Sequence, residues 1–341
     1  MSSETMRASV LTGVGSLTVE ERPVPSPAPH EVLVEVAAVG VCGSDVHYYR
    51  HGRIGDYVVR APMILGHELS GRIAAAGADV DPGRVGQRVA VEPQRPCRRC
   101  HHCLSGRYNL CPHMRFFATP PVDGALCRFV TIDAEMAHPV PDSMSDEAAA
   151  LLEPLSVAIA AMRKAAVAPG TSVLIAGAGP IGVMCAQTAR AFGAARIVVS
   201  DPAPARRDRV RRFGATETLD PSSVDVAALT PEVDAFIDAS GAPSAVVDGI
   251  KATGPAGRVV LVGMGADNYR LPVSYIQNME LVVTGVFRYT DTWPAATHLV
   301  TSGAVDVDSL VTGRFDLDHV DDALNSDADP ASLKSIVLPN A

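Results

Sequence analysis

A glycine-rich segment at residues 177–182 restricts the fold more than any other feature, and it reads Gly177-Ala178-Gly179-Pro180-Ile181-Gly182. An apolar run at 172–176 ends just before it, a helical pattern begins within it, and a second apolar run follows at 196–200. Such a turn is typical of dinucleotide binding. Gly177 permits the tight turn, Gly179 lets the backbone approach a pyrophosphate, and Gly182 allows the helix to pack closely on the strand. The helix N-terminus adds N–H donors for the phosphates.

The residues after the second apolar run predict which dinucleotide binds. Asp201 is placed to accept hydrogen bonds from ribose hydroxyls and to repel a 2′-phosphate, which favours NAD over NADP. Arg206 is placed either on the adenosine ribose or on a 2′-phosphate. It also belongs to an arginine-rich run at 206–212 that can equally be a solvated face. The predicted cofactor-binding residues are Gly177, Gly179, Pro180, Ile181, Gly182, Asp201 and Arg206.

Length and patterning predict two domains in an α/β protein. The chain has 341 residues, at about 100–200 residues per domain, and its 47% hydrophobic content rules out a disordered chain. Residues 1–150 have the pattern of short strands separated by Gly and Pro, such as 32–36 and 87–92. From about residue 145, an Ala-rich helical stretch broken at Pro154 leads into alternating strands and helices. That alternation predicts a parallel sheet.

Charge and hydropathy exclude several classes of function. The net charge is −9 without a basic stripe, so sequence-independent nucleic-acid binding is not expected. No run of about 18 apolar residues is present, and the first residues are polar, so neither a membrane span nor a secretion signal is expected. The expected location is the cytoplasm. Thiols stay reduced there, and clustered cysteines suggest a metal before a disulfide.

Four cysteines form a tight cluster with the spacing C-x2-C-x2-C-x7-C, namely Cys97, Cys100, Cys103 and Cys111. Four thiolates on one short loop suit a closed, tetrahedral, structural zinc site. An iron–sulfur cluster is the alternative, but the dinucleotide signal and the long final spacer favour zinc. His101 and His102 lie within the loop and are interpreted as exposed bystanders, because the four cysteines already complete the coordination.

A second group of potential ligands is dispersed along the chain. Cys42, His67, Glu68 and Glu153 carry the S, N and O donors that a catalytic zinc binds through three protein ligands, with one position left open. Each residue also has an ordinary structural interpretation: a core cysteine, a hydrogen-bonded histidine or a carboxylate at a helix end. The residues alone leave these alternatives open.

Together these motifs resemble the zinc-dependent medium-chain alcohol dehydrogenases over nearly the whole chain. Gly66-His67-Glu68 followed by Gly71 is similar to the family's zinc signature, and the 97–111 loop to its structural-zinc lobe. Within the family the chain most resembles the polyol branch, which includes sorbitol dehydrogenase. The segments that carry this resemblance are 53–57, 107–110, 118–121, 153–156 and 285–289.

The resemblance implies the architecture. A mostly β, GroES-like catalytic domain, a distorted barrel, is expected from residues 1–152 and 290–341, and a Rossmann NAD-binding domain from 153–289. The active site is expected in the cleft between them. The family also implies a homotetramer and two zinc ions per chain, one catalytic and one structural.

The resemblance also implies roles for individual residues. Cys42, His67 and Glu68 would bind the catalytic zinc, and Glu153 would hold a water on it or exchange with Glu68 as a ligand. The expected proton relay is Ser44 and His47, and the expected substrate-binding residues are Tyr48, Phe116, Arg288 and Tyr289. The predicted reaction is oxidation of a secondary hydroxyl of a polyol to a ketose. Threonine, butanediol or cyclitol oxidation is the enzymatic alternative, and non-catalytic dinucleotide binding is a less favoured one.

Overall fold

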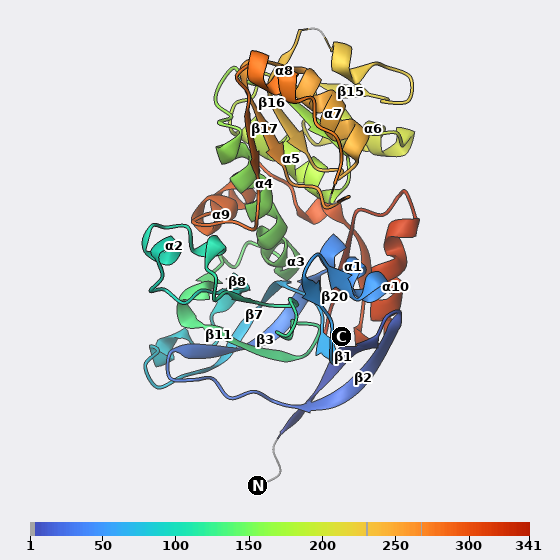
Figure 1. Ribbon diagram of the computed structural model, residues 1–341. Coiled ribbons are helices and arrows are strands. Elements are labelled where there is room, and N and C mark those ends of the chain that lie inside the picture. The colour runs from blue at the N-terminus through green and yellow to red at the C-terminus, as the bar shows by residue number, and fades with distance from the viewer. Residues whose placement is uncertain (1–3, 230, 267) are drawn as a thin grey trace. The chain divides into compact units, whose positions relative to one another are not determined.

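The computed structural model describes residues 4–229, 231–266 and 268–341, and it divides into two compact units. The first unit contains the chain up to Glu153 together with Val307–Ala341, and the second contains Pro154–Asp306. Both ends of the chain, blue and red in Figure 1, therefore belong to the first unit. No helix in these described ranges is long and apolar enough to cross a membrane.

The first unit is mostly β. Its largest sheet has seven strands in the order β12-β8-β7-β3-β20-β19, with β11 also paired to β3. Its strands are β1 (Thr5–Gly13), β2 (Ser16–Pro23), β3 (Glu31–Gly40), β4 (Arg53–Ile54), β5 (Tyr57–Val58), β6 (Met63–Ile64), β7 (Glu68–Ala76), β8 (Arg88–Val91), β9 (Gln94–Arg95), β10 (Arg115–Phe116), β11 (Phe129–Asp133), β12 (Ala137–Pro139), β19 (Val311–Phe315) and β20 (Lys334–Val337). Its helices are α1 (Gly43–His51), α2 (His101–Leu104), α3 (Asp146–Ala150) and α10 (Val320–Asn325).

Strand β3 shows why this sequence forms a sheet. Val32, Val34 and Val36 are fully buried, and the residues between them are only partly buried. This period of two directs one face of the strand into the core of the unit. Strand β3 pairs with β7 along one edge. Along the other edge its first half pairs with β11 and its end with β20, so β3 joins the two ends of the chain.

The second unit contains a six-stranded parallel sheet in the order β15-β14-β13-β16-β17-β18. From β13 the sheet extends through β14 to β15 on one side and through β16 and β17 to β18 on the other. This is the doubly wound arrangement of dinucleotide-binding folds. Its strands are β13 (Ser172–Ala176), β14 (Arg196–Ser200), β15 (Glu217–Leu219), β16 (Val233–Asp238), β17 (Thr253–Leu261) and β18 (Val282–Gly285). Its helices are α5 (Pro180–Ala191), α6 (Pro204–Arg212), α7 (Pro243–Lys251), α8 (Val273–Asn278) and α9 (Trp293–Thr301). The α/β fold class is confirmed.

The helical stretch near residue 150 differs in detail from the prediction. The break falls at Leu151, where α3 ends, and α4 (Leu152–Lys164) contains Pro154 in its first turn. Proline is tolerated there because the first backbone N–H groups of a helix have no partner within the helix.

The division into units also differs from the domain limits given by the sequence. By packing, residues 290–306 belong with the second unit, whereas the sequence-based limits assign them to the catalytic domain. The physical reason is that hydrogen bonds to helices of the second unit hold this segment near both of its ends. The Gln187 amide on α5 donates to the Asp306 carbonyl and accepts from the Asp306 N–H, at 3.0 and 2.8 Å. Arg163 on α4 also donates to the carbonyl of Asp291 at 2.7 Å.

Candidate functional site

Three of the dispersed candidate ligands converge in the first unit. One ligand atom each from Cys42, His67 and Glu68 lies within 4.8 Å of the other two. Cys42 precedes the first turn of α1, and His67 and Glu68 lie at the start of β7. Gly40, the partner of Glu68 in the β3–β7 pair, makes this possible, because a Cβ at Gly40 would lie 2.1 Å from Glu68 Oε2.

Asp45 organises this cluster, and the sequence analysis did not identify it. Its fully buried carboxylate accepts hydrogen bonds from the N–H groups of Cys42 and Gly66, at 3.1 and 2.9 Å. Its Oδ1 lies 3.6 Å from His67 Nδ1, which is an electrostatic contact rather than a hydrogen bond. Burial opposes the charged imidazole, but Asp45 and then Cys42 more than offset this and raise the pKa of His67. The spacing of Asp45 three residues after Cys42, typical of a helix capping box, could have identified it.

The donor set fits zinc. His67 is buried, and its Nδ1 has no hydrogen-bond partner among the described residues. A buried ring nitrogen without a hydrogen-bond partner costs free energy, unless a ligand such as a metal ion binds it. Thiolate, imidazole and carboxylate are the ligands that zinc prefers. Cys42, His67 and Glu68 would therefore hold a zinc ion.

Lys334 is a second residue that the sequence analysis missed. Its Nζ donates to Glu68 Oε1 at 2.6 Å and to the Val41 carbonyl at 2.7 Å, and it lies 2.5 Å from Glu68 Oε2. Burial disfavours the ammonium, but Glu68 and then Cys42 outweigh burial and raise the pKa of Lys334. A buried cation therefore already neutralises one of the candidate zinc ligands. No local pattern indicates Lys334, because it reaches the site through the pairing of β20 with β3.

Glu153 lies near this cluster but outside the set of three. It is 4% exposed at the start of α4, and its charge contributes to the raised pKa of Lys334. The three-residue group of close ligand atoms contains Glu68 and not Glu153. This geometry favours Glu68 as the third zinc ligand, which stays a prediction.

The four clustered cysteines meet as the spacing predicts. All four sulfurs lie within 4.8 Å of one another, and three of the separations are 3.4, 3.9 and 4.0 Å. Tetrahedral zinc with Zn–S bonds of about 2.3 Å requires sulfurs about 3.8 Å apart, whereas a disulfide requires about 2 Å. A hydrogen bond from the Arg99 N–H is the main cause that lowers the pKa of Cys97 to about 6. Burial, followed by the contact with Cys100, raises the pKa of Cys103 to about 12. A bound divalent cation would stabilise the four groups as thiolates.

Replacing Cys100 with serine should reduce the zinc content from two ions per chain to one. We also expect the thermal midpoint to fall by at least about 5 °C, because the loop loses the metal that holds it together. Elemental analysis and a thermal melt measure both effects, with Cys185→Ala, a change at a buried cysteine outside either cluster, as the control. A Cys100→Ser protein that melts like the parent after losing one zinc would contradict the structural role.

The glycine-rich turn has the geometry expected of a dinucleotide site. Gly177 has φ of +95°, a conformation that favours glycine, and a Cβ at Gly182 would lie 1.9 Å from the Gly177 carbonyl oxygen. Gly179 is the N-cap of α5, and nothing lies within 4 Å of the position its Cβ would take. A pyrophosphate fits the open space at Gly179. The backbone N–H groups in the first turn of α5, after Pro180, would donate to it. These residues would hold the dinucleotide.

Asp201 lies against the same turn. It is buried, with one carboxylate oxygen accepting from the Ala178 N–H at 2.8 Å and the other from the Ala203 N–H at 2.8 Å. Arg206 is partly buried in the first half of α6, and its Nε has no hydrogen-bond partner among the described residues. Its neighbour Arg207 donates a hydrogen bond to the Asp201 carbonyl at 2.6 Å, so a second arginine lies beside Asp201.

The remaining predicted residues are divided between the units. Ser44 and His47 lie on α1, and partial desolvation, followed by the charge of His51, lowers the pKa of His47. Tyr48 is buried on the same helix, and the Phe116 ring on β10 lies 5.4 Å from the His67 ring.

Arg288 and Tyr289 belong to the second unit. Arg288 has a positive φ of 57°, and its guanidinium stacks over the Phe287 ring at 4.6 Å. Tyr289 is 1% exposed and packs edge-on against Trp293. A substrate-binding role for these residues and for Tyr48 and Phe116 stays a prediction.

Comparisons with known proteins show the family of this chain. Residues 28–142 match the alcohol dehydrogenase GroES-like domain, and residues 180–302 match the zinc-binding dehydrogenase family. The chain is 40% identical to the sorbitol dehydrogenase of Bacillus subtilis, over 99% of this chain and 98% of that protein. It is 42% identical to a probable D-xylulose reductase A of Aspergillus fumigatus, over 96% and 95% of the two chains. An Escherichia coli alcohol dehydrogenase solved with NADH superposes with a TM-score of 0.92 at 27% identity, covering 98% of this chain and 99% of that one. The chain therefore belongs to the zinc-dependent medium-chain dehydrogenase family, in the branch that contains sorbitol dehydrogenase.

Proposed function

We propose that the protein oxidises a secondary hydroxyl of a polyol to a ketose, with NAD as the hydride acceptor. The observation that carries the proposal is the convergence of Cys42, His67 and Glu68 on one point in the first unit. The glycine turn with Asp201 in the second unit supports NAD as the cofactor. The names of the similar proteins, sorbitol dehydrogenase and D-xylulose reductase, support a polyol as the substrate.

Some residues of the proposed zinc site would bind the metal, and others position the residues that bind it. Cys42, His67 and Glu68 would hold the metal, and Asp45 fixes the loop before His67 through the Gly66 N–H. Zinc would supply a Lewis acid at this site, and NAD would supply a hydride acceptor. Glu153 takes the proton released from the hydroxyl, with Ser44 and His47 as an alternative path.

The substrate class follows from the polar groups proposed to line the pocket. Tyr48, Arg288 and Tyr289 each carry hydrogen-bond donors that the several hydroxyls of a polyol can satisfy. A simple aliphatic alcohol offers only one hydroxyl to these groups. The proposal therefore includes these side chains, together with Phe116, as the substrate-binding residues.

The proposal extends to assembly and location. We infer a homotetramer that acts in the cytoplasm on a small-molecule substrate. Light scattering on the purified protein tests the tetramer, and a mass of a single chain would contradict it.

A substrate screen tests the proposed reaction. The zinc-loaded protein is assayed with NAD against sorbitol, xylitol, arabinitols, threonine, butanediol and inositols, following NADH absorbance. We expect the highest kcat/KM with one of the linear polyols. A preference for threonine, butanediol or an inositol would replace the substrate class, and no NADH formation with any of them would contradict an alcohol dehydrogenase.

Replacing Asp201 with alanine should narrow the preference for NAD over NADP by at least about tenfold. The aspartate charge repels a 2′-phosphate, and its loss also removes an acceptor for the ribose hydroxyls. The measurement is kcat/KM with both cofactors, with Asp208→Ala, an exposed aspartate of α6, as the matched control. Equal efficiency with both cofactors in the unmodified protein would show that Arg206 or Arg207 outweighs Asp201.

A further inference from the structure

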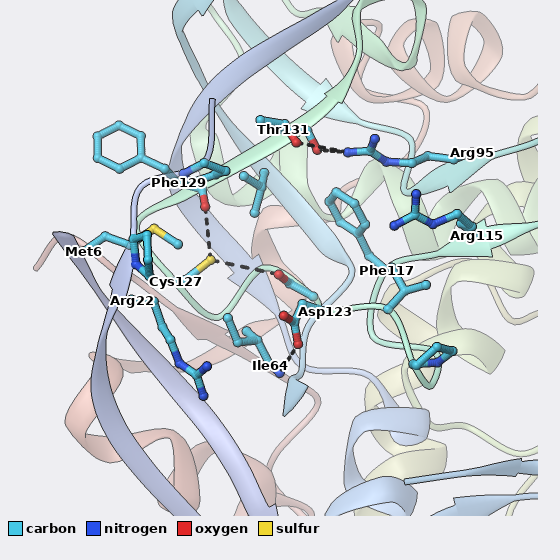
Figure 2. A pocket seen from close by; sticks show the side chains of 16 residues that line it. Met6, Arg22, Ile64, Arg95, Arg115, Phe117, Asp123, Cys127, Phe129 and Thr131 are labelled. Carbon is cyan, nitrogen blue, oxygen red and sulfur yellow. Dashed lines mark hydrogen bonds between the residues drawn. The ribbon is translucent and has the colours of Figure 1, made fainter. Parts of the chain in front are cut away.

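A hollow of about 530 Å³ opens on the first unit, away from the residues proposed to bind zinc or NAD. Its volume lies within the range of about 300–1,000 Å³ that is typical of small-molecule sites. Figure 2 shows a lining with an apolar part and a cationic part. Met6, Ile64, Phe117 and Phe129 contribute apolar surface, while Arg22, Arg95 and Arg115 contribute guanidinium groups.

The arginines on one side of the hollow face each other across a strand pair. Arg95 on β9 and Arg115 on β10 are direct partners in an antiparallel register, so their side chains leave the same face. Like charges at directly opposed positions destabilise a strand pair. An anion that pairs with either side chain reduces this repulsion, and water screens the exposed Arg115.

Protein groups neutralise only one of these two arginines. Arg95 forms an ion pair with Glu31 and donates to the Thr131 carbonyl, and its guanidinium lies 5.8 Å from the centroid of the Phe117 ring. In the described ranges the Arg115 guanidinium makes neither an ion pair nor a hydrogen bond to another residue. Strand β10 thus presents at the hollow a solvent-exposed guanidinium without an ionic partner among the described residues.

Arg22 adds a third guanidinium group to the lining. It is paired with Glu20 at 2.8 Å through Nη2, but its buried Nε has no hydrogen-bond partner among the residues the structure describes. The one acidic residue of the lining, Asp123, already accepts a hydrogen bond from the Ile64 N–H at 2.9 Å. Three guanidinium groups and one carboxylate therefore line the hollow.

We propose that this hollow binds a small organic oxyanion, a phosphate ester or carboxylate with an apolar body. The planar guanidinium of Arg115 would bind the oxyanion, because arginine pairs with phosphate and carboxylate through two parallel hydrogen bonds. The apolar body would lie against Phe117 and Met6. This site is independent of the polyol chemistry proposed for the zinc centre.

Strand β10 separates the hollow from the zinc centre. Successive side chains of a strand point to opposite faces. Phe116 lies against His67, at 5.4 Å between ring centroids, whereas Arg115 and Phe117 line the hollow. A change at Arg115 therefore alters the hollow without replacing a residue of the zinc site.

Calorimetric titration of the zinc- and NADH-loaded protein tests the proposal. NADH occupies the dinucleotide site, so an added phosphate ester cannot report binding there. The probes are phenyl phosphate, phenylacetate and the neutral benzyl alcohol. We expect at least one anion to bind and benzyl alcohol to bind far more weakly. Whichever anion binds identifies the headgroup.

Two arginine variants locate the bound probe. Arg115→Gln should weaken binding at least about tenfold, because a charge-assisted pair of hydrogen bonds is lost. Arg60→Gln, a change at an exposed arginine of the same unit that does not line the hollow, should leave it unchanged. Thermal melts of both variants confirm that they fold. Absence of binding by either anion at millimolar concentration would overturn the proposal. Binding that survives in Arg115→Gln would also overturn it, since the probe would then occupy another site.

Discussion

Replacing Glu153 with glutamine should slow turnover by about 100–10,000-fold while the protein keeps both zinc ions. Glu153 is nearly fully buried and lies outside the group of close ligand atoms, so we propose that it accepts the proton of the substrate hydroxyl rather than binding the metal. Glutamine has the same shape but cannot take up that proton. Glu147→Gln is the matched control, because Glu147 lies on the preceding helix and its carboxylate is bound by Arg314.

The corresponding change at Glu68 should have a different signature. Glu68→Gln weakens a ligand of the metal, so we expect catalytic zinc to be lost during dialysis and turnover to fall with zinc content. Zinc per chain and kcat, measured on the same samples, separate the two roles. If Glu153→Gln loses zinc while Glu68→Gln keeps it, the assignment is reversed. If neither change affects rate or metal content, the dehydrogenase chemistry proposed for this cluster is wrong.

Replacing Lys334 with methionine should destabilise the metal-depleted protein by about 3–5 kcal/mol. The ammonium of Lys334 is buried against both oxygens of Glu68, and removing one partner of a buried ion pair leaves the other charge uncompensated. Zinc supplies an alternative positive charge for the same carboxylate. The loss should therefore be smaller in the zinc-loaded protein than in the chelator-treated one.

Urea denaturation of the parent and variant, with zinc and with chelator, measures this difference. The double variant Glu68→Gln with Lys334→Met serves as the control, because it removes both charges and should recover part of the lost stability. Chelation also removes the structural zinc, but it does so in every variant, so the comparison between variants stays valid. An equal loss with and without zinc would show that Glu68 does not exchange between Lys334 and the metal.

The sequence determined those parts of the protein that depend on residues close together in the chain. The strands at 172–176 and 196–200 and the meeting of the four cysteines all follow from local patterns. Local spacing works here because a strand, a turn and a short metal-binding loop are each stabilised mainly by contacts within a few residues. The ligand set was predictable only through family resemblance, since Cys42 and His67 taken singly have ordinary structural interpretations.

The tertiary structure decided what surrounds those motifs. The pairing of β20 with β3 brings Lys334 to Glu68 from the far end of the chain, and no pattern near Lys334 indicates this contact. Burial then makes the contact strong, because two charges removed from water must neutralise each other. The antiparallel register of β9 and β10 likewise sets Arg95 opposite Arg115. The sequence contains both arginines, but no local pattern predicts that they lie opposite each other. Sequence supplies the chemical groups and their local geometry. Long-range pairing and desolvation decide which groups meet, and therefore which charges need a partner.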